Sequence, residues 1–96
     1  MSYEPFLQDQ ELSLSANEVT VNVLPNAKVI RLYPDTGDTY FYINHTNGVK
    51  VYLKEPLSIE NVDGQVDQII VGSAGTATCN VKQIGNVSRL SLRAGD

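Results

Sequence analysis

Apolar and polar residues alternate with a period of two along most of this 96-residue chain, and this alternation points to β-structure. The segment EVTVNV places Val19, Val21 and Val23 on one side of a strand, with Thr20 and Asn22 on the other. Such segments recur roughly every eight to twelve residues with turn residues between them, and no window has the spacing of an amphipathic helix. The sequence therefore predicts an all-β fold, an antiparallel β-sandwich of jelly-roll-like form with about 7–8 strands.

The length allows one domain, because 96 residues can bury a single modest core but not two. Residues 17–96 are predicted to form that single β-sandwich domain. Residues 1–16 have no clear period, yet they contain the apolar side chains of Tyr3, Phe6 and Leu7. They are either a loose tail or an arm that lays these side chains on a neighbouring subunit. We interpret them as an extended N-terminal arm.

The Asp-Thr-Gly triplet at residues 35–37 is the motif with which aspartic proteases present a catalytic aspartate. In those enzymes apolar residues precede the triplet and a small residue follows it, whereas here Pro34 precedes it and the charged Asp38 follows. Proline, aspartate and glycine in this order suit a hairpin turn between strands at 29–33 and 39–43. We therefore expect a turn in place of a catalytic loop, and a protein that is not an enzyme.

Two further hairpins are predicted from turn residues. The Asn-Gly dipeptide at residues 47–48 is the strongest short-range signal in the chain, because it can supply both positive φ angles of a type I′ turn. Residues 72–75 are predicted to turn between strands at 68–71 and 76–83. A last strand is predicted over residues 88–93.

Histidine and cysteine occur once each, as His45 and Cys79. One cysteine cannot form an intramolecular disulfide, and one histidine is too few for a blue-copper centre, a structural zinc site or a convincing catalytic triad. Cys79 alternates with Ala77 and Val81, so we expect a buried, inert thiol. His45 is expected at the solvated rim of its hairpin. We predict no catalytic, metal or cofactor site.

The charge balance restricts the class of partner. Seven Lys and Arg residues against eleven Asp and Glu residues give a net charge of -4, the wrong sign for binding phosphates, so no nucleic-acid partner is expected. No apolar run approaches the roughly 20 residues that span a bilayer, and the N-terminus does not resemble a signal peptide. We expect no membrane partner, and synthesis in a cytoplasm.

Tyrosines are the residues that most suggest a binding surface. Tyr33, Tyr40, Tyr42 and Tyr52 are expected on adjacent strands. They could form a protein contact, a sugar-binding platform, or cross-strand pairs that only cover the sheet. Together with the apolar residues of the arm they give the predicted interface residues: Tyr3, Phe6, Leu7, Tyr33, Tyr40 and Tyr42.

The segments NAKVIRLYPDTGDTYFYIN and IIVGSAGTATCNVKQIG, separated by a turn-rich stretch, resemble small β-sandwich virion proteins of tailed bacteriophages, especially capsid decoration (cement) proteins. The resemblance covers residues 17–85 and is one of sequence style. It implies a non-enzymatic structural protein of the virion, made in the host cytoplasm, that binds the major capsid protein or another virion protein. It also implies a homo-oligomer, often a trimer. The alternative from the tyrosines is a carbohydrate- or receptor-binding module.

Overall fold

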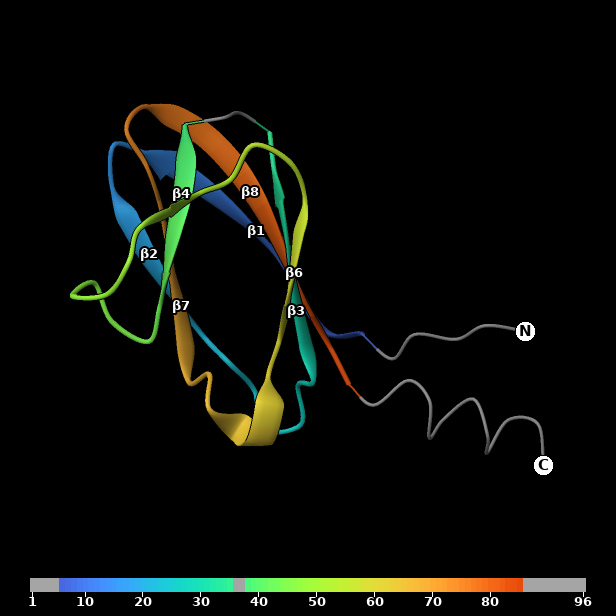
Figure 1. Cartoon of the computed structure of the whole chain (residues 1–96). Coiled ribbons are helices and arrows are strands. Elements are labelled where there is room, and N and C mark those ends of the chain that lie inside the picture. The colour runs from blue at the N-terminus through green and yellow to red at the C-terminus, as the bar shows by residue number, and fades with distance from the viewer. Residues whose placement is uncertain (1–5, 36–37, 86–96) are drawn as a thin grey trace.

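The computed structural model describes residues 6–35 and 38–85, and these form two four-stranded antiparallel sheets that face one another (Figure 1). Sheet A has the strand order β1-β8-β3-β6, and sheet B has the order β2-β7-β4-β5. Within the described ranges the chain contains one short 3-10 turn, Val62–Gly64, and no helix that is long and apolar enough to cross a membrane. The strands are β1 (Phe6–Ser15), β2 (Glu18–Asn22), β3 (Val29–Pro34), β4 (Thr39–Ile43), β5 (Val51–Tyr52), β6 (Leu57–Glu60), β7 (Gln68–Ser73) and β8 (Thr76–Ile84).

The pairing of the strands is that of a jelly roll. β1 pairs with β8, β2 with β7, β3 with β6 and β4 with β5, as if one long antiparallel ribbon had been wrapped into two sheets. β8 also pairs with β3, and β7 with β4, which completes each sheet. The predicted all-β, jelly-roll-like sandwich is confirmed.

Two of the three predicted hairpins are wrong. β3 and β4, on either side of residues 35–37, lie in different sheets. β7 and β8, on either side of residues 74–75, also lie in different sheets. These connections are corners at which the ribbon passes from one sheet to the other. A corner and a hairpin use the same turn residues, so the local sequence cannot tell them apart.

The hairpin of β4 and β5 is confirmed, but its predicted turn is not. Tyr40 pairs with Tyr52 across the two strands, and residues 44–50 connect them. The Asn-Gly dipeptide at 47–48 does not take positive φ angles; Asn44, at the start of the connection, has φ 70°. Its side-chain oxygen accepts hydrogen bonds from the backbone N–H groups of Asp67 and Gln68 at 2.7 and 3.3 Å. The conformation of Asn44 is therefore fixed by contacts far along the chain.

The predicted N-terminal arm requires a correction, because Phe6–Ser15 is strand β1 of sheet A. Leu12 and Leu14 point inward and are 4% and 2% exposed, since β1 pairs with the central strand β8. Polar Gln8 and Gln10 stand at the alternate positions before Leu12, and the register shifts between Phe6 and Gln8, so the period of two is obscured in the first half of the strand. Residues 1–5 and the predicted strand at 88–93 lie outside the described residues.

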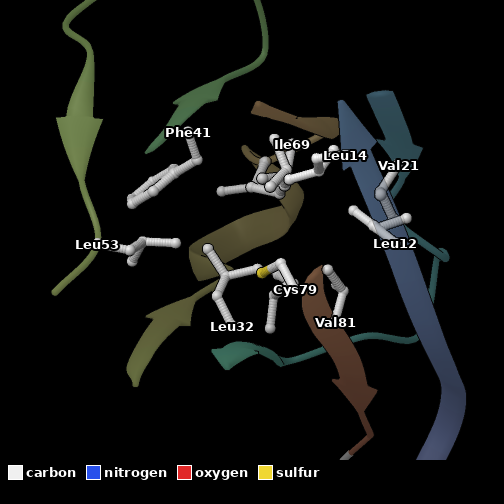
Figure 2. Packing of buried hydrophobic residues seen from close by; sticks show 12 residues of the cluster. Leu12, Leu14, Val21, Leu32, Phe41, Leu53, Ile69, Cys79 and Val81 are labelled. Carbon is white, nitrogen blue, oxygen red and sulfur yellow. The ribbon is translucent and has the colours of Figure 1, made fainter. Parts of the chain in front are cut away.

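Apolar side chains from both sheets meet between them (Figure 2). Ile30 and Leu32 on β3 are fully buried, and burial of each contributes roughly 1.5–3 kcal/mol. The alternation predicted for the strand at 76–83 is confirmed, because Ala77, Cys79 and Val81 all face inward and are buried. The core cluster consists of Leu12, Leu14, Val21, Ile30, Leu32, Phe41, Leu53, Val66, Ile69, Val71, Cys79 and Val81.

The corners of the wrapped ribbon are hydrogen-bonded to one another. At the β1–β2 corner, the N–H of Ala16 donates to the carbonyl of Gly75, and the carbonyl of Asn17 accepts from the N–H of Ser73. At the other end, buried Asn61 donates to the carbonyl of Ala27 and accepts from the N–H of Val66. The corners thus hold the two halves of the ribbon in register.

Gln83 on β8 is a fully buried polar side chain that joins sheet A to the end of β2. Its Oε1 accepts from the N–H of Leu24 at 2.8 Å, and its Nε2 donates to the carbonyl of Asn22 and to Oε1 of Gln8, both at 2.9 Å. An amide buried with its donors and acceptor engaged avoids the penalty of an unsatisfied polar group. This glutamine therefore fixes where β2 leaves sheet B.

We expect Gln83→Leu to lower the free energy of unfolding by about 1–3 kcal/mol, because it leaves the part-buried backbone groups of Leu24 and Asn22 without their partner. Gln10→Leu on the exposed part of β1 is the matched control and should stay within about 0.5 kcal/mol of the wild type. Urea unfolding at constant m-value measures both. Equal effects of the two substitutions would show that the buried amide carries no special role.

Candidate functional site

Three tyrosines and a lysine gather on the outer face of sheet B, and we call this group the tyrosine face. β4 supplies Tyr40 and Tyr42, β5 supplies Tyr52, and the connection between these strands supplies Lys50. The ring of Tyr40 meets those of Tyr42 and Tyr52 edge to face, with centroids 5.9 Å apart in each pair. Residues of opposite parity on β4, such as Phe41, point into the core.

The lysine is held by the aromatic rings. Lys50 Nζ lies 4.4 Å from the centroid of Tyr40, 5.9 Å from that of Tyr52 and 6.0 Å from that of Tyr42. A cation within about 6 Å of an aromatic face is attracted by the ring quadrupole. Desolvation opposes the charged form, but the phenol groups of Tyr42 and Tyr52 raise the pKa of Lys50. The tyrosine face therefore carries a fixed positive charge at neutral pH.

Tyr40 is fixed by a glycine and a glutamate on the neighbouring strands. Its ring crosses β7 at Gly72, and its hydroxyl donates to Oε2 of Glu18 on β2 at 3.0 Å. A Cβ at Gly72 would lie 2.8 Å from the Cζ and the hydroxyl of Tyr40, so no larger residue leaves this path open. Burial, and then the bond to Glu18, raises the pKa of Tyr40, which keeps its hydroxyl a donor.

The exposed part of the tyrosine face lies at the β5 edge. Tyr52 is 57% exposed and Val49 is 80% exposed, whereas Tyr42 is only 9% exposed. Tyr42 packs edge to face against Tyr40 and is itself nearly covered. A partner would therefore meet mainly Tyr52, Lys50 and the valine.

The other predicted interface residues lie elsewhere. The prediction that Tyr33 lies with the other tyrosines is wrong, because Tyr33 is on β3 in sheet A. The Nζ of Lys82 lies 5.7 Å from the Tyr33 ring centroid. Leu7 is 38% exposed at the start of β1, and Phe6 is the first residue of that strand. Tyr3 lies outside the described residues. Of the predicted interface residues, the structure brings together Tyr40 and Tyr42. Tyr52 joins them, as the predicted grouping of the tyrosines implies, and the structure adds Lys50 and the supporting Gly72.

Asp35 of the Asp-Thr-Gly triplet binds β8. Its Oδ1 accepts from the N–H of Thr78 at 3.0 Å, its Oδ2 accepts from the Thr78 hydroxyl at 2.7 Å, and its own N–H donates to the Thr78 carbonyl at 3.0 Å. The side-chain bond first, and then the backbone bond, lower the pKa of Asp35. The aspartate therefore fastens the β3–β4 corner to sheet A.

The two residues considered for metal or nucleophilic chemistry lie apart. Cys79 is fully buried as predicted, and desolvation raises the pKa of its thiol to about 11. His45 is exposed in the β4–β5 connection, also as predicted. Among the residues that the structure describes, no group of three His, Cys, Asp or Glu side chains could hold a metal ion.

Neither a family model nor a curated protein matches this chain. Among solved structures, it is similar to a de novo designed double-stranded β-helix determined by solution NMR, with a TM-score of 0.58 and 17% identity over 79% of this chain and 97% of that one. Bacillus endospore appendages, described as a novel family of disulfide-linked pili, give a TM-score of 0.45 and 10% identity over 86% and 90%. The first likeness supports the fold alone, and the second is too loose to carry an argument.

We expect Gly72→Ala to displace the Tyr40 ring and to lower the free energy of unfolding by about 1–3 kcal/mol, the usual cost of forcing an extra carbon into a packed site. Gly75→Ala is the matched control, because a Cβ there meets no atom within 4 Å. Thermal unfolding gives the stabilities, and the Tyr40 ring signals in NMR spectra report its position. An unmoved Tyr40 ring in the Gly72 variant would contradict this account.

A carboxyl titration followed by NMR should place the pKa of Asp35 below 3.8, and Thr78→Val should raise it, because the hydroxyl bond to the charged form is lost. A lowered pKa means that the contact stabilises the fold above the unfolded pKa and that this contribution disappears as pH falls through the folded value. Thr76→Val, an exposed change on the same strand, should leave the pKa of Asp35 unchanged. A titration at or above 3.8 in the wild type would show that Thr78 does not hold the carboxylate.

Proposed function

We propose that this chain is a non-enzymatic structural protein of a tailed-phage virion, a decoration protein that attaches to the assembled head through its tyrosine face. The observation that carries the proposal is the exposed aromatic edge of sheet B, where Tyr52 and Lys50 stand beside the 80% exposed Val49. Tyrosine is enriched at the centres of protein interfaces, so Tyr52 is the residue of this edge that best fits an anchor.

The construction of the tyrosine face suits a contact surface. Tyrosine offers a large contact area with few rotatable bonds, and the rings here are already packed edge to face. The bond from Tyr40 to Glu18 and the open path over Gly72 fix the central ring before any partner arrives. Little side-chain entropy would then be lost on binding.

The jelly-roll fold is compatible with attachment to a capsid, but it is also compatible with other functions. Jelly rolls build viral capsid domains and also lectins, so function has to be argued from the surface. The proposed partner is the major capsid protein or another virion protein, and the proposed state is a homo-oligomer, with a trimer favoured. When several copies of an oligomer bind a symmetric particle together, the overall affinity exceeds that of each single contact.

A carbohydrate- or receptor-binding module is the second candidate, favoured by the exposure of a single ring. Tyr52 is 57% exposed on one outer face, which would let it stack against a sugar. A glycan array with the wild type and Tyr52→Ala separates the two proposals. Binding of a glycan that depends on Tyr52, with no attachment to capsids, would replace the first proposal by the second.

Co-sedimentation with expanded capsids of a tailed phage tests the attachment. The wild type should sediment, and Tyr52→Ala should weaken binding by about 10-fold or more, as expected for an aromatic anchor at the centre of an interface. Lys50→Ala should weaken binding by several fold, because the cation that packs on the rings is lost. Tyr33→Ala is the matched control, since this tyrosine lies in sheet A. Wild-type protein that stays in the supernatant, or an equal loss in the control, would overturn the proposal.

A further inference from the structure

A second surface feature lies on the outer side of sheet A, the sheet that does not carry the tyrosine face. A cavity of about 200 Å³ opens there, and we call it the Arg31 pocket. β3 contributes two of its lining residues, and β6 with the residue before it contributes three. The pocket is lined by Arg31, Tyr33, Pro56, Leu57 and Ser58.

Two positively charged side chains lie at or beside this pocket, and one of them is paired with Asp9. Arg31 lines the pocket, and Lys82 of β8 lies opposite it in the strand register. Lys82 Nζ is 5.7 Å from the Tyr33 ring centroid and 3.0 Å from Oδ2 of Asp9, so its position is held from both sides. Arg31 also has contacts within the fold, and its guanidinium carries five N–H donors. Because Asp9 already pairs with Lys82, the guanidinium of Arg31 is the cation that an anion in the pocket would meet.

The remaining lining residues suit a ring with one apolar face and polar edges. Tyr33, Pro56 and Leu57 offer apolar surface, while the Ser58 hydroxyl can donate or accept a hydrogen bond. Ser58 lies opposite Arg31 in the register of β3 and β6, so the two polar groups are neighbours. Apolar walls with a few converging polar groups are typical of small-ligand sites.

The size of the pocket limits the ligand to one small unit. Sites for drug-sized molecules occupy roughly 300–1,000 Å³, and this cavity is smaller. Leu57 is 39% exposed, so the pocket is open to solvent and would hold a unit that belongs to a longer chain outside. A single pyranose ring fits these limits better than a flexible acidic side chain, which would leave the Tyr33 ring uncovered.

We propose that the Arg31 pocket binds one carboxylate-bearing sugar unit, of the hexuronate or sialate class. The carboxylate lies against the Arg31 guanidinium, whose planar fork matches it. The sugar ring packs against Tyr33, and a ring hydroxyl bonds to Ser58. This site is independent of the proposed attachment, and it would stay open to the medium while sheet B faces a particle.

Backbone amide shifts in NMR titrations of the folded wild-type protein test the proposal. Oligomers of galacturonic acid and sialyllactose are added in separate experiments, with neutral galactose oligomers and sodium acetate as controls. At least one acidic sugar should give saturable shifts at Arg31, Tyr33 and Ser58, with a dissociation constant about 10-fold or more below those of both controls. Saturation by neither acidic sugar, or equal affinity for acetate, would overturn the proposal. Tighter binding of a glutamate-rich peptide would assign the pocket to a protein partner instead.

Variants separate a built site from a general charge effect. Arg31→Lys keeps the charge but loses the fork, so it should weaken binding by several fold, and Tyr33→Ala should weaken it by about 10-fold. Lys28→Ala removes an exposed positive charge outside the pocket and should bind like the wild type. Tyr52→Ala should also bind normally, which distinguishes this site from the tyrosine face. If Lys28→Ala loses as much affinity as Arg31→Lys, the binding depends on overall charge and not on the pocket. Dispersed NMR spectra of each variant confirm that it is folded.

Discussion

The pairing of the first strand with the last is the constraint on which the rest of this structure depends. β8 lies between β1 and β3, and its inward side chains reach across to the strands of sheet B. Near the end of β8, buried Gln83 binds the backbone on either side of the point where the chain leaves β2. Once β1 and β8 are joined, the order of the remaining pairs follows from wrapping one ribbon, and β7 is placed between β2 and β4. That placement lets Tyr40 cross Gly72 to reach Glu18.

The two outer faces produced by this wrapping differ in chemistry. The outer face of sheet B presents packed rings, a lysine held above them and an apolar edge, which suits a broad contact with another protein. The outer face of sheet A presents Arg31 and Lys82 around Tyr33 and a small cavity, which suits a compact anionic ligand. Each sheet has one face in the core and one in solvent, so the two contacts that we propose would lie on opposite sides of the sandwich.

Period-two alternation was enough to predict the fold class, because Val21, Cys79 and Val81 face inward wherever their strands are placed. The pairing of strands was not predictable in the same way. Asp35 looked like part of a hairpin, but it binds Thr78 on a strand far along the chain. The sequence pattern predicts a turn at Gly72, but the structure places it within β7, where a glycine permits the close approach of another group. Tyr33 lies apart from the other tyrosines because β3 and β4, although consecutive in the chain, belong to different sheets.

The most direct test of the account is amide hydrogen exchange of the protein, free and bound to capsids. If the protein attaches through the tyrosine face, binding should slow amide exchange in residues 40–52. Exchange in β3 and β6 of the opposite sheet should then be the same as in the free protein. Protection confined to β3 and β6, or to the free edge of β1, would contradict the assignment of the two faces. The same experiment on the free protein should show β1 and β8 opening together, since they are the pair that closes the fold.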